Sequence, residues 1–246
     1  MAGDVLSREY EINYSYIDNH GVAKPSALWN IMQDAATVHA EASQLGPAAL
    51  HILWVLSRVR VRLNRPLLPY EHIRCETWCP GIRGVSWYRS FAFYAGHESV
   101  GEAQSMWVTL DPVSHRVLRP ASFPAAERYL QAARGDLFDP LAKLSCDETR
   151  LHHIHPVLYS DLDVNNHINN VRVVELVSDA LDLQREPCFV SALQVNYTAE
   201  TAFGEQLSLL TGMAGGARYV RGEADGSTRF EALAELTPLA SREGML

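Results

Sequence analysis

A short stretch near residue 165 gathers side chains that can do chemistry. Residues 159–170 read Y-S-D-L-D-V-N-N-H-I-N-N, which places Asp163, Asn165 and His167 at every second position. Side chains two residues apart share one face of an extended chain. We therefore predict an extended segment that points a carboxylate, an amide and an imidazole in the same direction.

Two asparagines connect this triplet to a helix. Asn169 and Asn170 precede an apolar run that begins at Val171. Asparagine favours this place because its side-chain oxygen can accept a hydrogen bond from a backbone N–H of the first helical turn. Taken alone, the segment fits equally well a polar loop that only caps a helix, since Asn and Asp are common in loops. The rest of the chain decides between the two readings.

The composition narrows the classes of protein. The chain has 246 residues, of which 47% are hydrophobic and 20% charged, as in ordinary globular proteins. Its net charge of −8 argues against nucleic-acid binding by bulk charge. No apolar run reaches the roughly 18 residues of a membrane span, and the N-terminus lacks a secretory signal pattern. We therefore expect a cytoplasmic protein with no nucleic-acid partner and no membrane span.

Cysteine and histidine give little sign of a metal site. The four cysteines are scattered, which favours reduced thiols over a disulfide framework. The histidine-rich run at 152–155 is more typical of a surface than of a metal site, and no Cys/His pairs recur at zinc-finger spacing. We expect neither a metal ion nor a cofactor.

Hydrophobic spacing predicts a mixed chain of helices and strands. Pro25 suits the first turn of a helix, where a backbone N–H would have no partner. Apolar residues at helical spacing then continue to Gly46-Pro47. A second helix is predicted from Val171 to Leu181. Alternating apolar residues between turn signals predict strands at 55–63, 73–78, 85–95, 100–110, 154–159, 189–198, 206–213, 218–223 and 228–236.

The second half of the chain repeats the first. Identical residues lie 145 positions apart around each predicted helix and 134 positions apart in the strands that follow. The pairs are Tyr14 and Tyr159, Ser15 and Ser160, Asp18 and Asp163, Asp34 and Asp179, Ala35 and Ala180, then Ser57 and Ser191, Val61 and Val195, Glu71 and Glu205, Thr77 and Thr211. Two different shifts indicate a connection of different length after each helix.

This repeat predicts the fold. A sheet with one apolar face must cover that face, and a single apolar helix can do so. We predict an α+β tandem (double) hotdog, in which two antiparallel sheets are each wrapped round a central helix and join side by side. The N-terminal hotdog is expected at 1–122, a connector at 123–150 and the C-terminal hotdog at 151–246.

The halves differ where chemistry would matter. The first half has D-N-H-G-V at 18–22 in place of the D-V-N-N-H of 163–167, so the alternating triplet is lost. Glu200 corresponds to Pro66 under the shift of 134 residues. We therefore predict one active site in each chain, in the C-terminal half.

These motifs resemble those of the acyl-ACP thioesterases of plants and bacteria, which release fatty acids from acyl carrier protein. The resemblance covers nearly the whole chain and rests on W-V-L-S-R-V-R-V (54–61), E-T-W-C-P-G-I-R-G (76–84), W-V-T-L-D (107–111) and S-D-L-D-V-N-N-H-I-N-N (160–170). It implies a tandem hotdog and a hydrolase that cleaves fatty acyl-ACP and so ends chain elongation. The implied partner is acyl carrier protein with its phosphopantetheine-linked acyl chain, and we also allow for a homodimer.

The resemblance also implies site residues. The catalytic Asp, Asn and His of the family match Asp163, Asn165 and His167, and its downstream acid matches Glu200. Many plant members carry a cysteine after that acid, whereas this chain has Thr201, so the resemblance implies catalysis without a thiol there.

Residue chemistry suggests how these groups would act. We hypothesise that Glu200 is the general base for a water that His167 and Asn165 orient. The carbonyl oxygen of the thioester would face a backbone N–H at the helix start after Asn169. Asp163 would either orient its neighbours or attack the carbonyl itself through an anhydride. The sequence does not choose between these roles for Asp163.

Further residues are candidates for substrate contact. Arg58, Arg60 and Arg62 line one face of a predicted strand, either as a solvated face or as a dock for the acidic carrier and its phosphate. Trp29 and Met32 are expected in the core, and the resemblance implies that the interior of the first half helps to shape the acyl pocket. Asn169 and Asn170 would lie beside the bound thioester.

Three rival functions remain open at this point. An acyl-CoA thioesterase would use the same chemistry, and assays with both substrates separate the two. A hotdog dehydratase fits less well, because the D-x-N-x-H triplet with a downstream Glu suits hydrolysis. A non-catalytic acyl-binding hotdog would retain its ligand without turnover.

Overall fold

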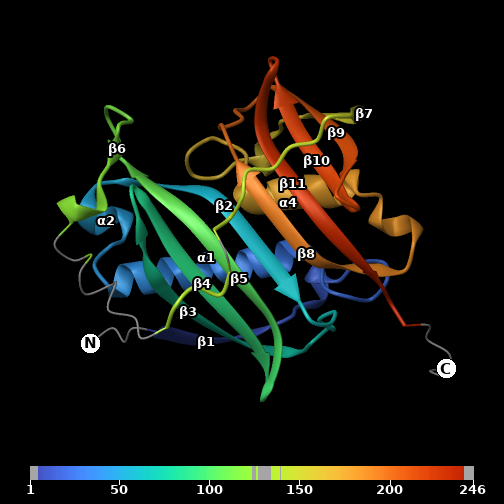
Figure 1. Cartoon of the computed structure of the whole chain (residues 1–246), viewed down its shortest axis with the longest axis horizontal. Coiled ribbons are helices and arrows are strands. Elements are labelled where there is room, and N and C mark those ends of the chain that lie inside the picture. The colour runs from blue at the N-terminus through green and yellow to red at the C-terminus, as the bar shows by residue number, and fades with distance from the viewer. Residues whose placement is uncertain (1–4, 124–125, 127–133, 139, 241–246) are drawn as a thin grey trace.

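The computed structural model describes residues 5–123, 126, 134–138 and 140–240 (Figure 1). The first half contains β1 (Val5–Glu11), the 3₁₀ helix η1 (Tyr14–Tyr16), α1 (Pro25–Ala42), α2 (Pro47–Leu50), β2 (Leu53–Leu63), β3 (His72–Arg83), β4 (Ser86–Ala95), β5 (Glu98–Leu110), β6 (Val117–Leu118) and η2 (Pro120–Ser122). The second half contains β7 (Thr149–Pro156), η3 (Tyr159–Asp161), α4 (Asn170–Ala180), η4 (Leu183–Arg185), β8 (Cys188–Tyr197), β9 (Gln206–Ala214), β10 (Ala217–Ala224) and β11 (Ser227–Pro238).

The strands form one antiparallel sheet that is doubled about its centre. Their order is β1-β3-β4-β5-β2-β8-β11-β10-β9-β7, with β6 pairing to β5. Strands β2 and β8 join the halves, in a register from Arg58 opposite Asn196 to Arg62 opposite Ala192. Figure 1 shows α1 behind the sheet of the first half and α4 behind that of the second. The predicted tandem hotdog is confirmed, with its two sheets continuous across this seam.

The two helices start at equivalent places and end differently. Pro25 opens α1 and Asn170 opens α4, which are 145 positions apart as the repeat predicts. Helix α1 has 18 residues and α4 has 11, and α2 follows α1. The stretch from the start of the helix to the next strand is therefore longer in the first half, from Pro25 to Leu53, than in the second, from Asn170 to Cys188, as the smaller second shift predicts. Helix α1 ends at Ala42, a few residues before the predicted stop at Gly46-Pro47.

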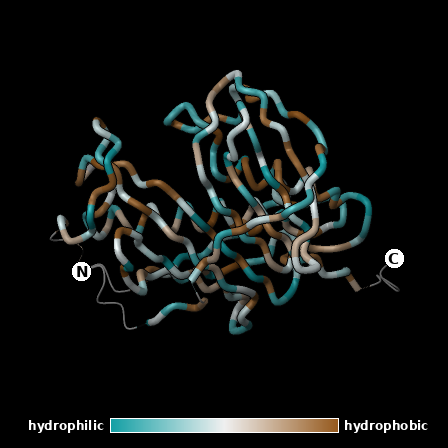
Figure 2. Tube along the Cα trace, turned by 45° about the horizontal axis from the view of Figure 1, so that its top comes forward, coloured by the Kyte–Doolittle hydropathy of each residue, from teal (hydrophilic) through white to brown (hydrophobic). Residues whose placement is uncertain are grey.

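Both halves share one hydrophobic core. The main cluster of buried side chains includes Leu28 and Ile31 of α1, Val174 of α4, Val59 of β2 and Val195 of β8. Along the strands, apolar residues alternate with polar ones, and Figure 2 shows brown and teal stretches in alternation. Because the seam strands β2 and β8 contribute to the same cluster, the two halves hold each other in position.

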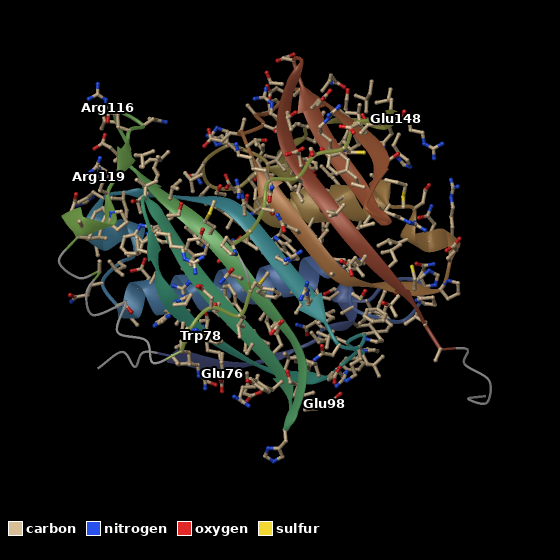
Figure 3. The ribbon with its side chains drawn as sticks, viewed as in Figure 1. Glu76, Trp78, Glu98, Arg116, Arg119 and Glu148 are labelled. Atoms are coloured by element: carbon tan, nitrogen blue, oxygen red, sulfur yellow. The ribbon has the colours of Figure 1, made fainter. Side chains whose placement is uncertain are left out.

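The connector crosses the outer face of the sheet. Its residue Gly135 lies against β3, because Trp78 Nε1 donates a hydrogen bond to the Gly135 carbonyl at 3.2 Å. At the seam, Asn196 Nδ2 donates to the Ala142 carbonyl at 3.0 Å. Trp78 and Glu148, both labelled in Figure 3, mark the two ends of this crossing. Residues 124–125, 127–133 and 139 of the predicted connector lie outside the described residues. Because the described part of the connector crosses from β3 to the seam between the two halves, we propose the division into 1–122, 123–150 and 151–246.

No helix among the described residues is long and apolar enough to cross a membrane.

Candidate active site

Residues 163–167 form a tight turn, so the prediction of an extended segment is wrong. Leu162 pairs with Ile168 across the turn, and the backbone N–H of Asp163 donates to the His167 carbonyl at 2.9 Å. Asn166 takes a left-handed conformation with φ 60°, which asparagine tolerates better than most residues. The alternating spacing reflects a turn held by local hydrogen bonds.

The carboxylate of Asp163 organises this turn. Its Oδ1 accepts hydrogen bonds from the backbone N–H of Asn165 at 2.8 Å and of His167 at 3.4 Å. Its Oδ2 accepts from the Asn165 side-chain Nδ2 at 3.4 Å. An aspartate that bonds backbone N–H groups two residues ahead is a common turn device. The three predicted residues therefore come together through Asp163.

The turn pairs with the segment that follows β8, and this pairing brings in Glu200. The backbone N–H of Ile168 donates to the Thr201 carbonyl at 2.9 Å, and His167 forms a bridge with Ala202. As a result, His167 Nε2 lies 3.3 Å from Glu200 Oε2. The His167 side chain is 32% exposed and that of Glu200 62% exposed, so water reaches both groups.

The start of α4 lies directly beside this cluster. Asn169 caps the helix, because its Oδ1 accepts from the backbone N–H of Val171 at 2.8 Å. The carbonyl of Asn170 accepts from the Tyr197 hydroxyl at 3.1 Å, and that hydroxyl accepts from Trp29 Nε1 at 3.1 Å. Burial raises the pKa of Tyr197, so its phenol stays neutral. Sequence reasoning gave no sign of Tyr197, which links α1 to the site.

The first half contains the same turn without the same chemistry. Asp18 Oδ1 accepts from the backbone N–H of His20 at 2.8 Å and of Val22 at 3.1 Å. The backbone N–H of Asp18 donates to the Val22 carbonyl at 2.9 Å, as in the second half. Gly21, with φ 79°, stands where the second half has Asn166. The aspartate therefore builds the turn in both halves.

The equivalent of the second loop is also preserved in the first half. The backbone N–H of Ala23 donates to the Leu67 carbonyl at 2.9 Å, matching the bond from Ile168 to Thr201. Only the side chains differ, because Val22 takes the place of His167 and Pro66 that of Glu200. The repeat thus distinguishes the aspartate, which forms the backbone turn in both halves, from His167 and Glu200, which occur in the second half alone.

Sequence reasoning missed the buried carboxylate of Asp161, which holds the whole loop. Asp161 is 1% exposed, and its Oδ2 accepts from the backbone N–H of Leu158 at 2.8 Å. His155 Nε2 lies 2.8 Å from Oδ2, and Arg172 Nε donates to Oδ1 at 2.7 Å. Burial by itself works to raise the pKa of Asp161, but these hydrogen bonds outweigh it and hold the pKa below its usual range. Asp161 and Asp163 lie two residues apart, and nothing in the sequence shows which of the two is buried.

The arginine row on β2 lies under the connector. Arg58 Nη1 donates to the Leu141 carbonyl, and the guanidinium groups of Arg60 and Arg62 lie 5.9 and 5.3 Å from the centre of the Phe138 ring. All three therefore have contacts within the chain, and docking of a carrier at this row remains a prediction that these contacts do not favour.

Trp29 and Met32 are core residues, at 3% and 4% exposure. A cavity of about 130 Å³ in the first half lies along the following turns of α1. Its lining comprises Gln33, Ala36, Thr37, Ala40, Trp54, Cys79, Trp87, Tyr88, Arg89 and Trp107. The three tryptophans were visible in the sequence, but only the fold shows that they meet. In the part of the chain that the structure describes, no group of three His, Cys, Asp or Glu residues could hold a metal ion.

Two family profiles match this chain. The profile of the acyl-ACP thioesterase N-terminal domain matches residues 3–121, and that of the C-terminal domain matches residues 145–231. The chain belongs to the acyl-ACP thioesterase family. Within this family chain, the turn, Glu200 and the capped start of α4 all lie in the segment that matches the C-terminal domain.

Curated relatives agree with this assignment. A palmitoyl-acyl carrier protein thioesterase of Gossypium hirsutum is 26% identical over 229 residues, which cover 85% of this chain and 55% of that protein. An oleoyl-acyl carrier protein thioesterase of Coriandrum sativum is 26% identical over 187 residues, which cover 65% of this chain and 49% of that protein. The chain spans about half the length of these two relatives.

Solved structures share the fold. An acyl-ACP thioesterase from Bacteroides thetaiotaomicron superimposes with a TM-score of 0.83 at 22% identity, over 95% of this chain and 98% of that one. A 12:0-ACP thioesterase from Umbellularia californica gives 0.79 at 22% identity, over 96% and 98%. At 22% identity, the similarity to these two structures shows a shared fold and nothing beyond it.

We predict that Asp161→Asn lowers the free energy of unfolding by about 2 kcal/mol near pH 7, because it removes the buried charge that accepts hydrogen bonds from the Leu158 N–H and from Arg172. The lowered pKa of Asp161 sets the sign of the pH dependence. The carboxylate stabilises the folded chain above the ordinary carboxyl pKa of about 3.9 and loses that effect as the pH falls through the folded-state pKa.

Urea unfolding of wild type and variant at several pH values between about 3 and 7 measures this difference. It should shrink toward the acid end of the series. A difference that stays constant or grows as the pH falls contradicts the assigned role of Asp161.

Proposed function

We propose that this chain hydrolyses the thioester of a fatty acyl group carried on acyl carrier protein and releases the free fatty acid. The observation that carries the proposal is the 3.3 Å contact between His167 Nε2 and Glu200 Oε2. It supports a water-activating cluster beside a helix start, as thioester hydrolysis requires. An acyl-CoA thioester could react at the same cluster. A cytoplasmic location and a homodimer remain predictions.

In the proposed reaction a water molecule is the nucleophile. Glu200 takes one proton from the water, and His167 holds the carboxylate in place through their contact. The water oxygen bonds to the carbonyl carbon, and negative charge develops on the carbonyl oxygen beside the first N–H groups of α4. The carbon–sulfur bond then breaks, and the proton on Glu200 passes to the departing phosphopantetheine thiolate.

We propose that Asp163 positions Asn165 and His167 and does not itself attack the thioester carbonyl to form an anhydride. Asp163 Oδ1 accepts backbone hydrogen bonds from Asn165 and His167, as Asp18 Oδ1 does from His20 and Val22 in the half that lacks the other groups. A residue that makes the same bonds in both halves is needed for the turn in both. Asn165 and His167 depend on that turn for their orientation.

We propose that the acyl chain lies along α1. Trp29, Gln33, Ala36 and Ala40 follow one stripe of the helix at intervals of three and four residues. Trp29 connects through Tyr197 to the start of α4, and the other three residues line the cavity. The stripe from Trp29 to Ala40 spans about 16 Å at the rise of an α-helix, and its apolar far end suits the methyl end of a fatty acyl group.

Glu200→Gln and His167→Ala should each lower kcat on acyl-ACP by about tenfold or more, because general acid–base assistance contributes ~10²–10⁴-fold. His20→Ala, in the equivalent turn of the first half, is the matched control and should keep its turnover. Steady-state assays with purified, folded proteins test this. Near-normal turnover in either site variant removes that residue from the mechanism.

Asp163→Asn distinguishes the two roles of this carboxylate. The asparagine oxygen can still accept from the N–H groups of Asn165 and His167, so kcat should fall by less than in Glu200→Gln. An aspartate that attacks the carbonyl cannot be replaced by an amide, and loss of all turnover in Asp163→Asn favours the anhydride route. The measurement is kcat of both variants on one acyl-ACP.

Ala40→Phe should shift the preference toward shorter acyl chains, because it places a ring at the far end of the cavity. We expect turnover of the longest accepted acyl-ACP to drop by about tenfold while that of the shortest is unchanged, since a site that excludes methylenes discriminates by ~10–200-fold. A panel of acyl-ACPs of increasing length is the assay. An unchanged profile places the acyl chain elsewhere.

A further inference from the structure

Four large apolar side chains are exposed on the two loops that carry the candidate active site. Leu158 is 52% exposed, Tyr159 86%, Val164 97% and Phe203 64%. We call these four residues the apolar rim. Single exposed apolar residues are common on protein surfaces, but a group of them around one site marks an interaction surface.

The backbone holds the two loops of the rim together. The N–H of Val157 donates to the Glu205 carbonyl at 3.0 Å, and the N–H of Gly204 donates to the Val157 carbonyl at 3.1 Å. Farther along, the bond from Ile168 to Thr201 at 2.9 Å joins the same loops. The rim and the pair of His167 and Glu200 therefore belong to one surface.

These loops offer no arginine or lysine for salt bridges to an acidic partner. Residues 157–170 and 198–205 contain no Lys or Arg. The nearby cations are engaged within the chain, since Arg172 pairs with Asp161 at 2.7 Å and Arg229 pairs with Glu205 at 2.7 Å. A partner that approaches this surface meets apolar side chains and the carboxylates of Asp163 and Glu200.

We infer that the apolar rim is the docking surface for the acyl carrier protein and that the contact is mainly hydrophobic. This inference rests on the proposed function. A phosphopantetheine arm that delivers its thioester to His167 and Glu200 brings the carrier to the side of the molecule where these loops are exposed. An anionic membrane would find no cation on these loops, which disfavours a lipid surface as the partner.

The test is binding and turnover in Val164→Ser and Phe203→Ser, singly and together. Binding is measured with a non-hydrolysable amide analogue of acyl-ACP, so that it does not depend on catalysis. We expect each substitution to raise Kd for this analogue, and KM for acyl-ACP, by about tenfold, as for a central apolar contact residue. Turnover of acyl-pantetheine, which has no carrier, should be unchanged. The loss should persist between about 0.05 and 0.5 M salt, since charge-driven docking is screened in that range.

The duplicated turn offers a matched control. Tyr14 is the first-half equivalent of Tyr159 and is 68% exposed. Tyr159→Ser should weaken binding of the analogue, and Tyr14→Ser should not. Equal losses with acyl-pantetheine, an unchanged Kd, or loss only of binding to anionic phospholipid vesicles would each overturn the inference. If wild type binds the amide analogue but hydrolyses no acyl-ACP, the proposed function fails while the docking surface stands.

Discussion

The pairing between the turn at 163–167 and the segment after β8 determines what this protein can do. The hydrogen bond from the Ile168 N–H to the Thr201 carbonyl, at 2.9 Å, and the bridge between His167 and Ala202 join two loops that are far apart in sequence. Without this pairing, Glu200 would have no fixed relation to His167. Both groups are partly exposed, so the backbone must supply the order that burial does not. Asp161 also orders the loop that contains the turn, because its buried carboxylate accepts a hydrogen bond from Arg172 at the start of α4.

The tandem repeat contains this backbone arrangement twice, but the pair of His167 and Glu200 occurs in the second copy alone. Both halves retain the aspartate turn and its pairing with the following loop, because that frame places the start of the central helix on the sheet. The first half has Val22 and Pro66 at the positions of His167 and Glu200, and its longer helix, α1, lines a cavity with its later turns. In the proposed reaction the second half supplies the reacting side chains and the first half supplies the space for the acyl chain. The shared core and the seam of β2 and β8 fix the two halves together.

Much of this could be predicted from the sequence. The helix starts and most strand positions follow from hydrophobic spacing and turn signals, and the repeat follows from identical residues at two fixed shifts. The predicted strands do not include β1, and one of them extends past the end of β7 into the 3₁₀ helix η3. The loss of the triplet in the first half is the basis for predicting a single site in the second half. The turn was misread as extended, because alternation of polar residues does not distinguish a strand face from an aspartate turn. Asp161 and Tyr197 were missed because their importance lies in partners distant in sequence, Arg172 and Trp29. The arginines of β2 looked free, since no local pattern shows that the connector covers them.

We propose that His167 and Glu200 act as one unit in catalysis. A double-mutant cycle on kcat, with His167→Ala, Glu200→Gln and the combined variant on a single acyl-ACP, measures this coupling. Groups that act as a unit are strongly non-additive, so the combined variant should be no slower than the slower single variant, within about threefold. Losses that multiply in the combined variant would show that the two groups act independently and that their contact plays no part in catalysis.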